Sequence, residues 1–215
     1  MSLIDIHSHL LPKVDDSKLS KFSFSKMMKT YREAGIENLC FSPHINDPYV
    51  DTKMDKIEPT FEWASEKAKK EGINTYLGCE LYITEGEIPQ KFYPHFSRYV
   101  LCETNVDFAP KCYLDSLRKI KDKGYEIIIA HIERYNWLNP ESETFRVMKE
   151  ELGVLVQINA SSSRTSKANE YLTRGLVDFI ASDNHGKFEL PKLLAETLAS
   201  NPRVYQKMNN FIKSI

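Results

Sequence analysis

Histidine and acidic residues directly follow several short apolar runs of this 215-residue chain. In the first run, LIDIHSHLLPKVDD at residues 3–16, His7 and His9 are two positions apart. Because side chains alternate faces along a strand, both imidazoles point to the same side and form a chelating pair. The same spacing joins Asp183 to His185 in SDNH. These residue types at this spacing predict a metal site.

Four more residues of the same kinds end other apolar runs. They are His44 in FSPH, Glu80 in GCE, Glu103 in LCE and His131 in IIAH. A single histidine at such a place is more often an ordinary packed residue, but so many ionisable groups buried together without a cation would leave unpaired charge at high cost. Imidazole and carboxylate ligands without a thiolate suit Mn²⁺, Zn²⁺ or Fe²⁺. The set is too large for one ion, so we expect two or three divalent ions, with the Glu80 carboxylate bridging two of them.

A repeated order of charged helical segment, glycine and β-branched or aromatic run indicates how these side chains are positioned. The glycines expected at the left-handed ends of helices are Gly35, Gly72, Gly124, Gly153 and Gly175. Seven strand-like runs are present: LIDIH, IENLCFSPH, INTYLGCE, RYVLCE, YEIIIAH, VLVQIN and LVDFIASDNH. Short apolar strands that alternate with amphipathic helices indicate parallel β/α units. We therefore predict an α/β fold, a distorted seven-stranded (β/α)7 TIM-like barrel, as a single domain over residues 1–215.

In a parallel barrel the carboxyl ends of the strands converge on one rim, where barrel enzymes place their chemistry. Five of the six histidines thereby face one point. The sixth, His95, precedes a strand and is expected to be structural. Among the helices, residues 18–35 are expected to bury one stripe, made of Leu19, Phe22, Met27 and Tyr31.

Composition excludes several classes of function. Lys+Arg is 29 and Asp+Glu is 30, and without a long basic run nucleic acid is not an expected partner. No window approaches the roughly 18 apolar residues of a membrane span, so we expect a cytoplasmic protein. Cys112 and Arg118 have the spacing of a cysteine-dependent phosphatase loop, but residues 110–124 instead predict an amphipathic helix without the glycines that such a loop needs.

Six motifs together resemble the polymerase and histidinol phosphatase (PHP) superfamily: DIHSHLLPKVDD, FSPH, GCE, HIER, QINASS and IASDNH. They run in order from residue 5 to residue 185, which is nearly the whole chain. Within the superfamily the sequence is most similar to the manganese-dependent bacterial tyrosine-protein phosphatases that regulate capsule and exopolysaccharide synthesis. Each motif is weak alone, but the ordered set is specific.

The resemblance implies a trinuclear centre, with Mn²⁺ as the expected ion. By this resemblance His7, His9 and Asp183 hold one metal, Glu103 and His131 hold a second, and Glu80 bridges the two. The third metal is held by Asp16, His44 and His185. Aspartate at position 16 and glutamate at position 103 indicate the tyrosine phosphatase branch.

The implied reaction is hydrolysis of a phosphate monoester, with Arg134, Asp183 and His185 as catalytic residues. Arg134 would meet the phosphate, the alternative being a surface ion pair with Glu133. Further expected substrate contacts are Asn159, Ser161 and Lys187, although Asn159, Ser161 and Ser162 are equally typical turn formers. Tyr49, Tyr82 and Tyr135 could form an aromatic wall for a phosphotyrosyl ring or pack in the core.

The expected partner is a phosphotyrosyl protein, specifically a bacterial tyrosine kinase. Two other functions remain open. The chain could be a histidinol-phosphate phosphatase or another small-molecule phosphoesterase, against which Asp16 and Glu103 argue. It could also be a catalytically silent metal-binding module that regulates a partner, against which the full ligand set and Arg134 argue.

Overall fold

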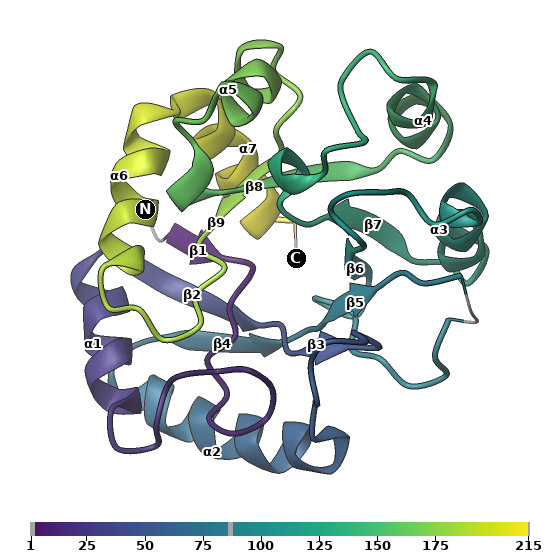
Figure 1. The fold of residues 1–215 in the computed structure, drawn as a ribbon. Coiled ribbons are helices and arrows are strands. Elements are labelled where there is room, and N and C mark those ends of the chain that lie inside the picture. The colour runs from purple at the N-terminus through teal and green to yellow at the C-terminus, as the bar shows by residue number, and fades with distance from the viewer. Residues whose placement is uncertain (1–2, 86–87, 215) are drawn as a thin grey trace.

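The computed structural model describes residues 3–85 and 88–214. Parallel strands surround the centre of the molecule and helices cover the outside (Figure 1). The strands are β1 (Leu3–Asp5), β2 (Ile36–Phe41), β3 (His44–Ile45), β4 (Asn74–Leu77), β5 (Glu80–Tyr82), β6 (Tyr99–Glu103), β7 (Glu126–Ile129), β8 (Leu155–Asn159) and β9 (Phe179–Ala181). The helices are α1 (Phe24–Glu33), α2 (Ile57–Lys70), α3 (Tyr113–Asp122), α4 (Glu143–Arg146), α5 (Ser166–Thr173), α6 (Leu190–Ser200) and α7 (Pro202–Ile212). Four short helices complete the chain: η1 (Met54–Lys56), η2 (Ile132–Arg134), η3 (Val147–Glu151) and η4 (Ala160–Ser162).

The strands form two parallel sheets, in the orders β1-β2-β4 and β3-β5-β6-β7-β8-β9. All seven expected runs contain strands, but two of them are interrupted, so that β2 and β3 belong to one run and β4 and β5 to another. The α/β fold with parallel strands is therefore confirmed, while a single closed barrel of seven strands is not. Beyond β1 and β9 the chain still pairs, because the amide of Asp183 donates to the carbonyl of His7 at 3.0 Å.

The interruption has an identifiable cause. Pro43 lies between β2 and β3 and has no amide hydrogen to give to a ladder. Gly78 lies between β4 and β5, and a Cβ atom there would stand 2.5 Å from the His95 ring. The register is nevertheless the same on both sides, since Phe41 faces Leu77 and His44 faces Glu80, each 36 positions apart (77 − 41 and 80 − 44). Across the break the amides of Gly78 and Glu80 still donate to the carbonyls of Phe41 and Pro43, at 2.8 Å and 3.1 Å, so the pairing continues without a slip.

Helices end just before the predicted glycines, but α1 begins later than the sequence predicts. All five predicted glycines have positive φ, which confirms the left-handed position. In α1 the buried side chains are Phe24, Met27, Met28 and Tyr31, which recur at helical spacing. The predicted stripe was wrong at Phe22, which is 99% exposed, because the helix starts only after Ser23. The hydroxyls of Ser20 and Ser23 bond each other and the local backbone, which favours a turn there.

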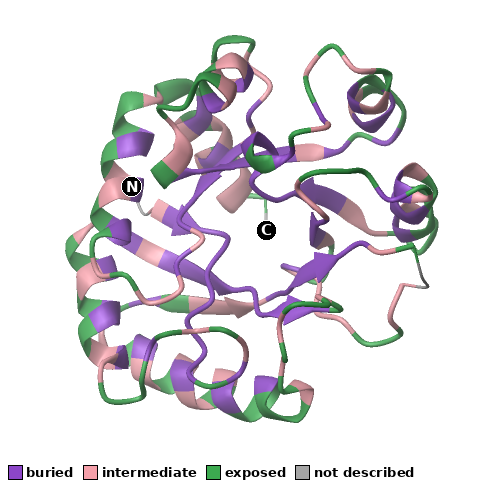
Figure 2. Ribbon diagram, viewed as in Figure 1, coloured by how far each residue is buried: buried purple, intermediate pink, exposed green. Residues whose placement is uncertain are grey.

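The core lies between the sheets and the inward faces of the helices. Figure 2 shows buried strands and helices that are buried along one side only. His95 belongs to this core, fully buried, and its Nε2 donates to the carbonyl of Ile6 at 3.0 Å. Burial, aided by the neighbouring His7 imidazole, lowers the pKa of His95 to about 4. This neutral, packed histidine agrees with the structural role expected for it.

The buried state of His95 predicts a pH dependence of stability. Because its folded-state pKa of about 4 lies below the usual value of 6.5, the unfolded chain binds more protons between these values. Through this residue the free energy of unfolding falls by about 2 kcal/mol from pH 7 to pH 5. In His95→Gln, which keeps a donor for Ile6, the fall should be smaller by that amount. Urea unfolding of both chelator-treated proteins at the two pH values measures it, and equal falls contradict the prediction.

Candidate metal centre

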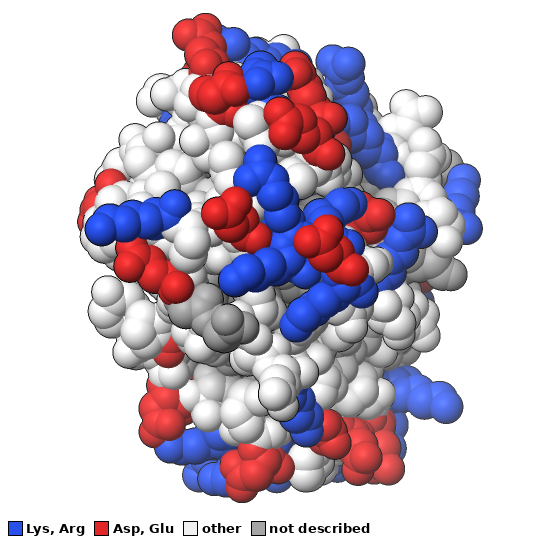
Figure 3. Space-filling view, turned by 90° about the vertical axis from the view of Figure 1, so that its right-hand side faces the viewer, with Lys and Arg blue, Asp and Glu red and all other residues white. Residues whose placement is uncertain are grey.

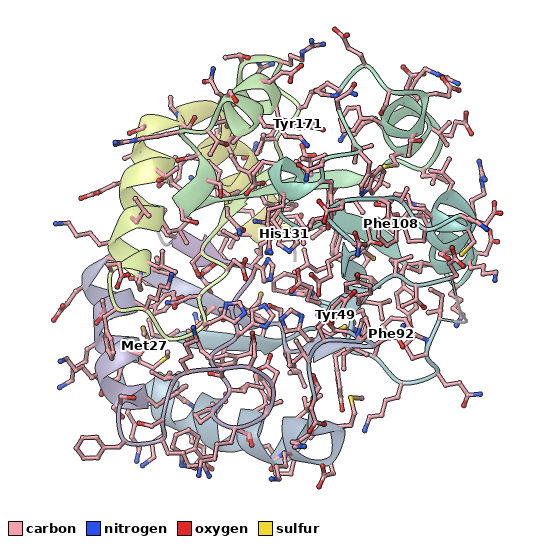
Figure 4. The ribbon with its side chains drawn as sticks, in the orientation of Figure 1. Met27, Tyr49, Phe92, Phe108, His131 and Tyr171 are labelled. Atoms are coloured by element: carbon pink, nitrogen blue, oxygen red, sulfur yellow. The ribbon has the colours of Figure 1, made fainter. Side chains whose placement is uncertain are left out.

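Nine predicted ligand residues converge at the carboxyl ends of the strands, and His131, one of them, is labelled in Figure 4. Most follow a strand, but Glu80 begins β5 in the middle of its interrupted run. Four groups of side chains have ligand atoms within 4.8 Å of one another: His7, His9 and Glu80; Glu80, Glu103 and His131; His9, Asp16, His44 and His185; and His44, Asp47 and Glu103. The residues singled out in the sequence are thus brought together.

The first group surrounds one oxygen of Glu80. The Nε2 atoms of His7 and His9 are 3.0 Å apart, and each lies 3.2 Å from Glu80 Oε2. Asp183 Oδ1 is 3.5 Å from His7 Nε2 and 3.6 Å from His9 Nε2. All of these residues except Asp183 are at most 1% exposed.

The backbone fixes which nitrogen of His7 carries hydrogen. The amide of His131 donates to Gln157 Oε1 at 2.9 Å, so this atom is an acceptor. His7 Nδ1 lies 3.2 Å from the same oxygen and must therefore be the donor, which leaves a lone pair on Nε2. His9 is arranged in the same way, with Nδ1 at 3.0 Å from Asp15 Oδ2.

Three acceptor atoms therefore meet in a buried space. Glu80 Oε2 has no hydrogen-bond partner among the described residues. Burial raises the pKa of Glu80, but the facing imidazoles of His7 and His131 outweigh it and hold the pKa well below its usual range. Lone pairs on imidazole and carboxylate with no hydrogen between them fit a divalent cation.

The second group uses the other oxygen of Glu80. His131 Nε2 lies 2.9 Å from Glu80 Oε1 and 3.6 Å from Glu103 Oε2. Glu80 Oε1 thus faces the imidazole of His131 and Oε2 faces those of His7 and His9, so this carboxylate could bridge two ions. His131 has φ of 30° and Asp183 has φ of 50°, so two candidate ligands have left-handed backbone that non-glycine residues rarely adopt.

The third group lies nearer to solvent. Asp16 Oδ2 is 3.3 Å from His185 Nε2, and Asp16 Oδ1 is 3.8 Å from His44 Nε2. The Asp16 side chain is 44% exposed, whereas the first two groups are buried. The His9 ring stacks on those of His44 and His185, with centroids 4.2 Å apart in both cases. Asp16, His44 and His185 therefore lie together with His9 beside them, while His44 Nδ1 also lies 2.8 Å from Glu103 Oε1 of the second group.

Sequence reasoning missed three residues that support this centre. Asp15 orients His9 and also accepts from the amide of His44 at 3.3 Å. Asp47 Oδ2 lies 3.6 Å from His44 Nδ1. Gln157 orients His7 as described. Each had a signal in the sequence: Asp15 adjoins Asp16, Asp47 follows His44 by three positions, and Gln157 shares a strand face with Asn159.

Asn159 lies behind the centre. Its side-chain Nδ2 donates to Asp183 Oδ2 at 2.8 Å, and its side-chain Oδ1 accepts from Gln157 Nε2 at 2.8 Å. Both ends of the side chain are therefore used by protein groups, and it supports Asp183. Its part in substrate binding stays a prediction.

The other expected substrate residues surround the mouth of the centre. Ser161 and Lys187 line a hollow of about 280 Å³ together with Asp183 and His185. Arg134 is 50% exposed, with Nη1 at 3.6 Å from Asp183 Oδ2. The alternative ion pair with Glu133 is wrong, because Glu133 is buried and accepts from the amide of Asn159 at 3.0 Å.

The remaining sequence alternatives are also decided by burial and helix geometry. Arg118 lies within α3, where it pairs with Asp115 at 2.9 Å, so Cys112 and Arg118 form no phosphate loop. Tyr135 is fully buried and packs in the core. Tyr49 and Tyr82 lie at the rim, with ring centroids 6.4 Å apart.

The fold and the site define a class of parallel α/β proteins whose histidines and carboxylates gather at the strand ends, where they could hold metal ions. The sequence profile described as capsular polysaccharide synthesis, CpsB/CapC, matches residues 3–210. The chain belongs to this family, which confirms the resemblance seen in the motifs.

Individual relatives agree. The chain is 29% identical over 214 residues to the tyrosine-protein phosphatase CpsB of Streptococcus agalactiae, with 90% of this chain and 87% of the relative covered. It is 26% identical over 203 residues to the tyrosine-protein phosphatase YwqE of Bacillus subtilis (strain 168), covering 85% and 77%.

Solved structures share the fold. Crystal structures of YwqE from Bacillus subtilis and CpsB from Streptococcus pneumoniae, described as unique metal-dependent tyrosine phosphatases, match with a TM-score of 0.80 at 24% identity, covering 97% of this chain and 92% of the other. A histidinol phosphate phosphatase from Lactococcus lactis, complexed with zinc, L-histidinol and phosphate, matches with a TM-score of 0.58 at 14% identity, covering 95% and 94%.

The orienting role of Gln157 predicts a loss of metal affinity on substitution. In Gln157→Leu, His7 loses its acceptor and its hydrogen is no longer confined to Nδ1. Affinity for Mn²⁺ should fall about 10- to 100-fold, as for other residues that orient metal ligands. Titration calorimetry on the metal-free protein measures it. Gln157→Glu keeps the acceptor but loses the donor to Asn159, so it should lose less. Equal affinity of Gln157→Leu and wild type contradicts the role.

Proposed function

We propose that this protein is a metal-dependent phosphatase that hydrolyses phosphotyrosine on proteins. The observation that carries the proposal is Glu80, a buried carboxylate whose Oε1 faces the imidazole of His131 and whose Oε2 faces those of His7 and His9. That arrangement supports two adjacent divalent ions, as phosphoryl chemistry uses. The names of the relatives supply the substrate, since those proteins are tyrosine-protein phosphatases.

The proposed ligand sets follow the groups of side chains. His7, His9 and Asp183 would hold the first ion, Glu103 and His131 would hold the second, and Glu80 would contribute to both. Asp16, His44 and His185 hold a third. Mn²⁺ is the proposed ion, with Zn²⁺ and Fe²⁺ as alternatives that the same ligands accept. When bound, such ions lower the pKa of water to about 7 and neutralise phosphate charge.

Substrate binding is proposed for residues at the solvent-facing opening of the metal centre. The guanidinium of Arg134, half-exposed beside Asp183, is placed to bind two phosphate oxygens in a planar fork. Ser161 and Lys187 line the adjoining hollow and would contact the substrate there. Tyrosine leaves as a phenolate, whose parent acid has a pKa of about 10, so it needs little help from a proton donor.

The proposed partner is a phosphotyrosyl protein, a bacterial tyrosine kinase of capsule or exopolysaccharide synthesis, met in the cytoplasm. The family's description as capsular polysaccharide synthesis supports this setting. Among the described residues, none of the helices has the length and apolar character needed to cross a membrane. The face in Figure 3 mixes Lys and Arg with Asp and Glu, which does not favour a nucleic acid.

Substrate comparison tests the proposal against its runner-up, histidinol-phosphate phosphatase, whose fold is shared. Mn²⁺-loaded protein should turn over a phosphotyrosyl peptide with a higher kcat/KM than histidinol phosphate, and a chelator should abolish both activities. Preference for histidinol phosphate would assign the chain to small-molecule chemistry. If both activities survive the chelator, metal dependence is refuted. If the Mn²⁺-loaded protein turns over neither substrate, a silent metal-binding module is favoured.

Substitution of Arg134 tests the phosphate contact. Arg134→Ala should lower kcat/KM for the phosphotyrosyl peptide about 10²- to 10³-fold, as the loss of a charge-stabilising donor does elsewhere. Bound metal, measured by plasma mass spectrometry, should not change. The matched control is Arg118→Ala, which removes an arginine of similar exposure from the outer face of α3 and should leave kcat/KM as in wild type. Full activity in Arg134→Ala would contradict the role.

A further inference from the structure

Three large hydrophobic side chains are well exposed among the described residues: Phe22 at 99%, Tyr49 at 78% and Phe108 at 62%. Two of them stand beside the metal centre. Tyr49 comes five positions after His44, and Phe108 comes five positions after Glu103. In Figure 4 both lie on the side of His131 that faces α3. Exposed aromatic side chains that adjoin a functional site indicate a surface for a partner.

Both loops are held in defined conformations. The amide of Tyr49 donates to Asp47 Oδ1 at 2.7 Å, and the amide of Phe108 donates to Asn105 Oδ1 at 3.3 Å. The Phe108 loop is tied further by Trp137 Nε1, which donates to the carbonyl of Asn105 at 2.9 Å. The two aromatic rings are therefore presented by ordered turns, so a partner would not have to order them.

Tyr82 joins the two loops into one surface. Its ring stands nearly perpendicular to that of Tyr49, at 77°, and its hydroxyl makes a hydrogen bond with Asn105. Asn105 in turn holds the amide of Phe108. We call Tyr49, Tyr82 and Phe108 the aromatic ledge.

The size of the aromatic ledge fits a peptide. Its outer members follow β3 and β6, which are separated by β5 in the sheet. Neighbouring strands are about 4.8 Å apart, so the two loops leave the sheet about 10 Å apart, the length of about three extended residues. The nearby carboxylates of Asp47 and Asp107 disfavour an acidic segment.

We propose that the aromatic ledge binds an apolar side chain next to the phosphotyrosine of a substrate polypeptide. This inference rests on the proposed function and deepens it, because it names a feature of the substrate beyond its phosphate. The phosphotyrosine enters the metal centre, and the neighbouring residue packs on Tyr49 and Phe108. An uncharged apolar residue at that place raises affinity through KM.

Two phosphotyrosyl peptides test the inference, identical except that leucine or serine flanks the phosphotyrosine. Wild type should show a kcat/KM about three- to tenfold higher for the leucine peptide. The double variant with Tyr49→Ser and Phe108→Ser should lose this preference. The matched control is Phe22→Ser, which removes an equally exposed aromatic next to α1 and should keep the preference.

A binding measurement separates this inference from the proposed function. Fluorescence anisotropy with the same peptides, carrying a nonhydrolysable phosphonate in place of the phosphate, reports the preference without turnover. Binding preference that the double variant loses supports the ledge even if neither phosphopeptide is hydrolysed. Equal binding of the two peptides by wild type, preference retained in the double variant, or no binding of either peptide would each overturn it. If the double variant sediments differently from wild type but keeps the peptide preference, the surface would be assigned to self-association. That result would also overturn the inference.

Discussion

The buried carboxylate of Glu80 is the constraint on which the rest of the centre depends. It lies between imidazoles on two sides, and no hydrogen-bond donor satisfies its Oε2 among the described residues. An unpaired buried carboxylate is costly, and the same low dielectric strengthens its attraction for a cation. The strained backbone at His131 and Asp183 points in the same direction, because strain of this kind persists only where the surroundings over-determine it.

A layer of side chains behind the ligands gives the centre its precision. The backbone amide of His131 donates to Gln157 Oε1 and so fixes the orientation of the Gln157 side chain. The same oxygen then accepts from His7 Nδ1 and orients that ring. The side-chain amide of Gln157 also donates to that of Asn159, which in turn donates to the carboxylate of Asp183. Candidate ligands on three strands or strand ends are therefore fixed relative to one another in the metal-free protein. Less ordering of side chains would then be needed when a metal ion binds.

Much of this could be predicted from the sequence. The alternation of strand and helix, the glycines after helices and the histidines after strands follow local rules, and local rules hold along β/α units. The supporting layer could not be predicted in the same way, because Asp15 and Gln157 become informative only once their partners across the fold are known. Phe22 was misplaced for a local reason, since serine hydroxyls that bond the backbone ended the helical pattern early. The need for glycine at position 78 came from the ring of His95, more than ten positions away in the chain.

The unbroken register across that interruption links the centre to the folding of the sheet. His44 and Glu80 are direct Cα partners, so the ladder itself brings a third-group residue against the bridging carboxylate. A slip of one residue would turn every side chain of that strand to the opposite face. Only the native alignment presents the full set of candidate ligands, so a bound ion would favour it over a slipped one.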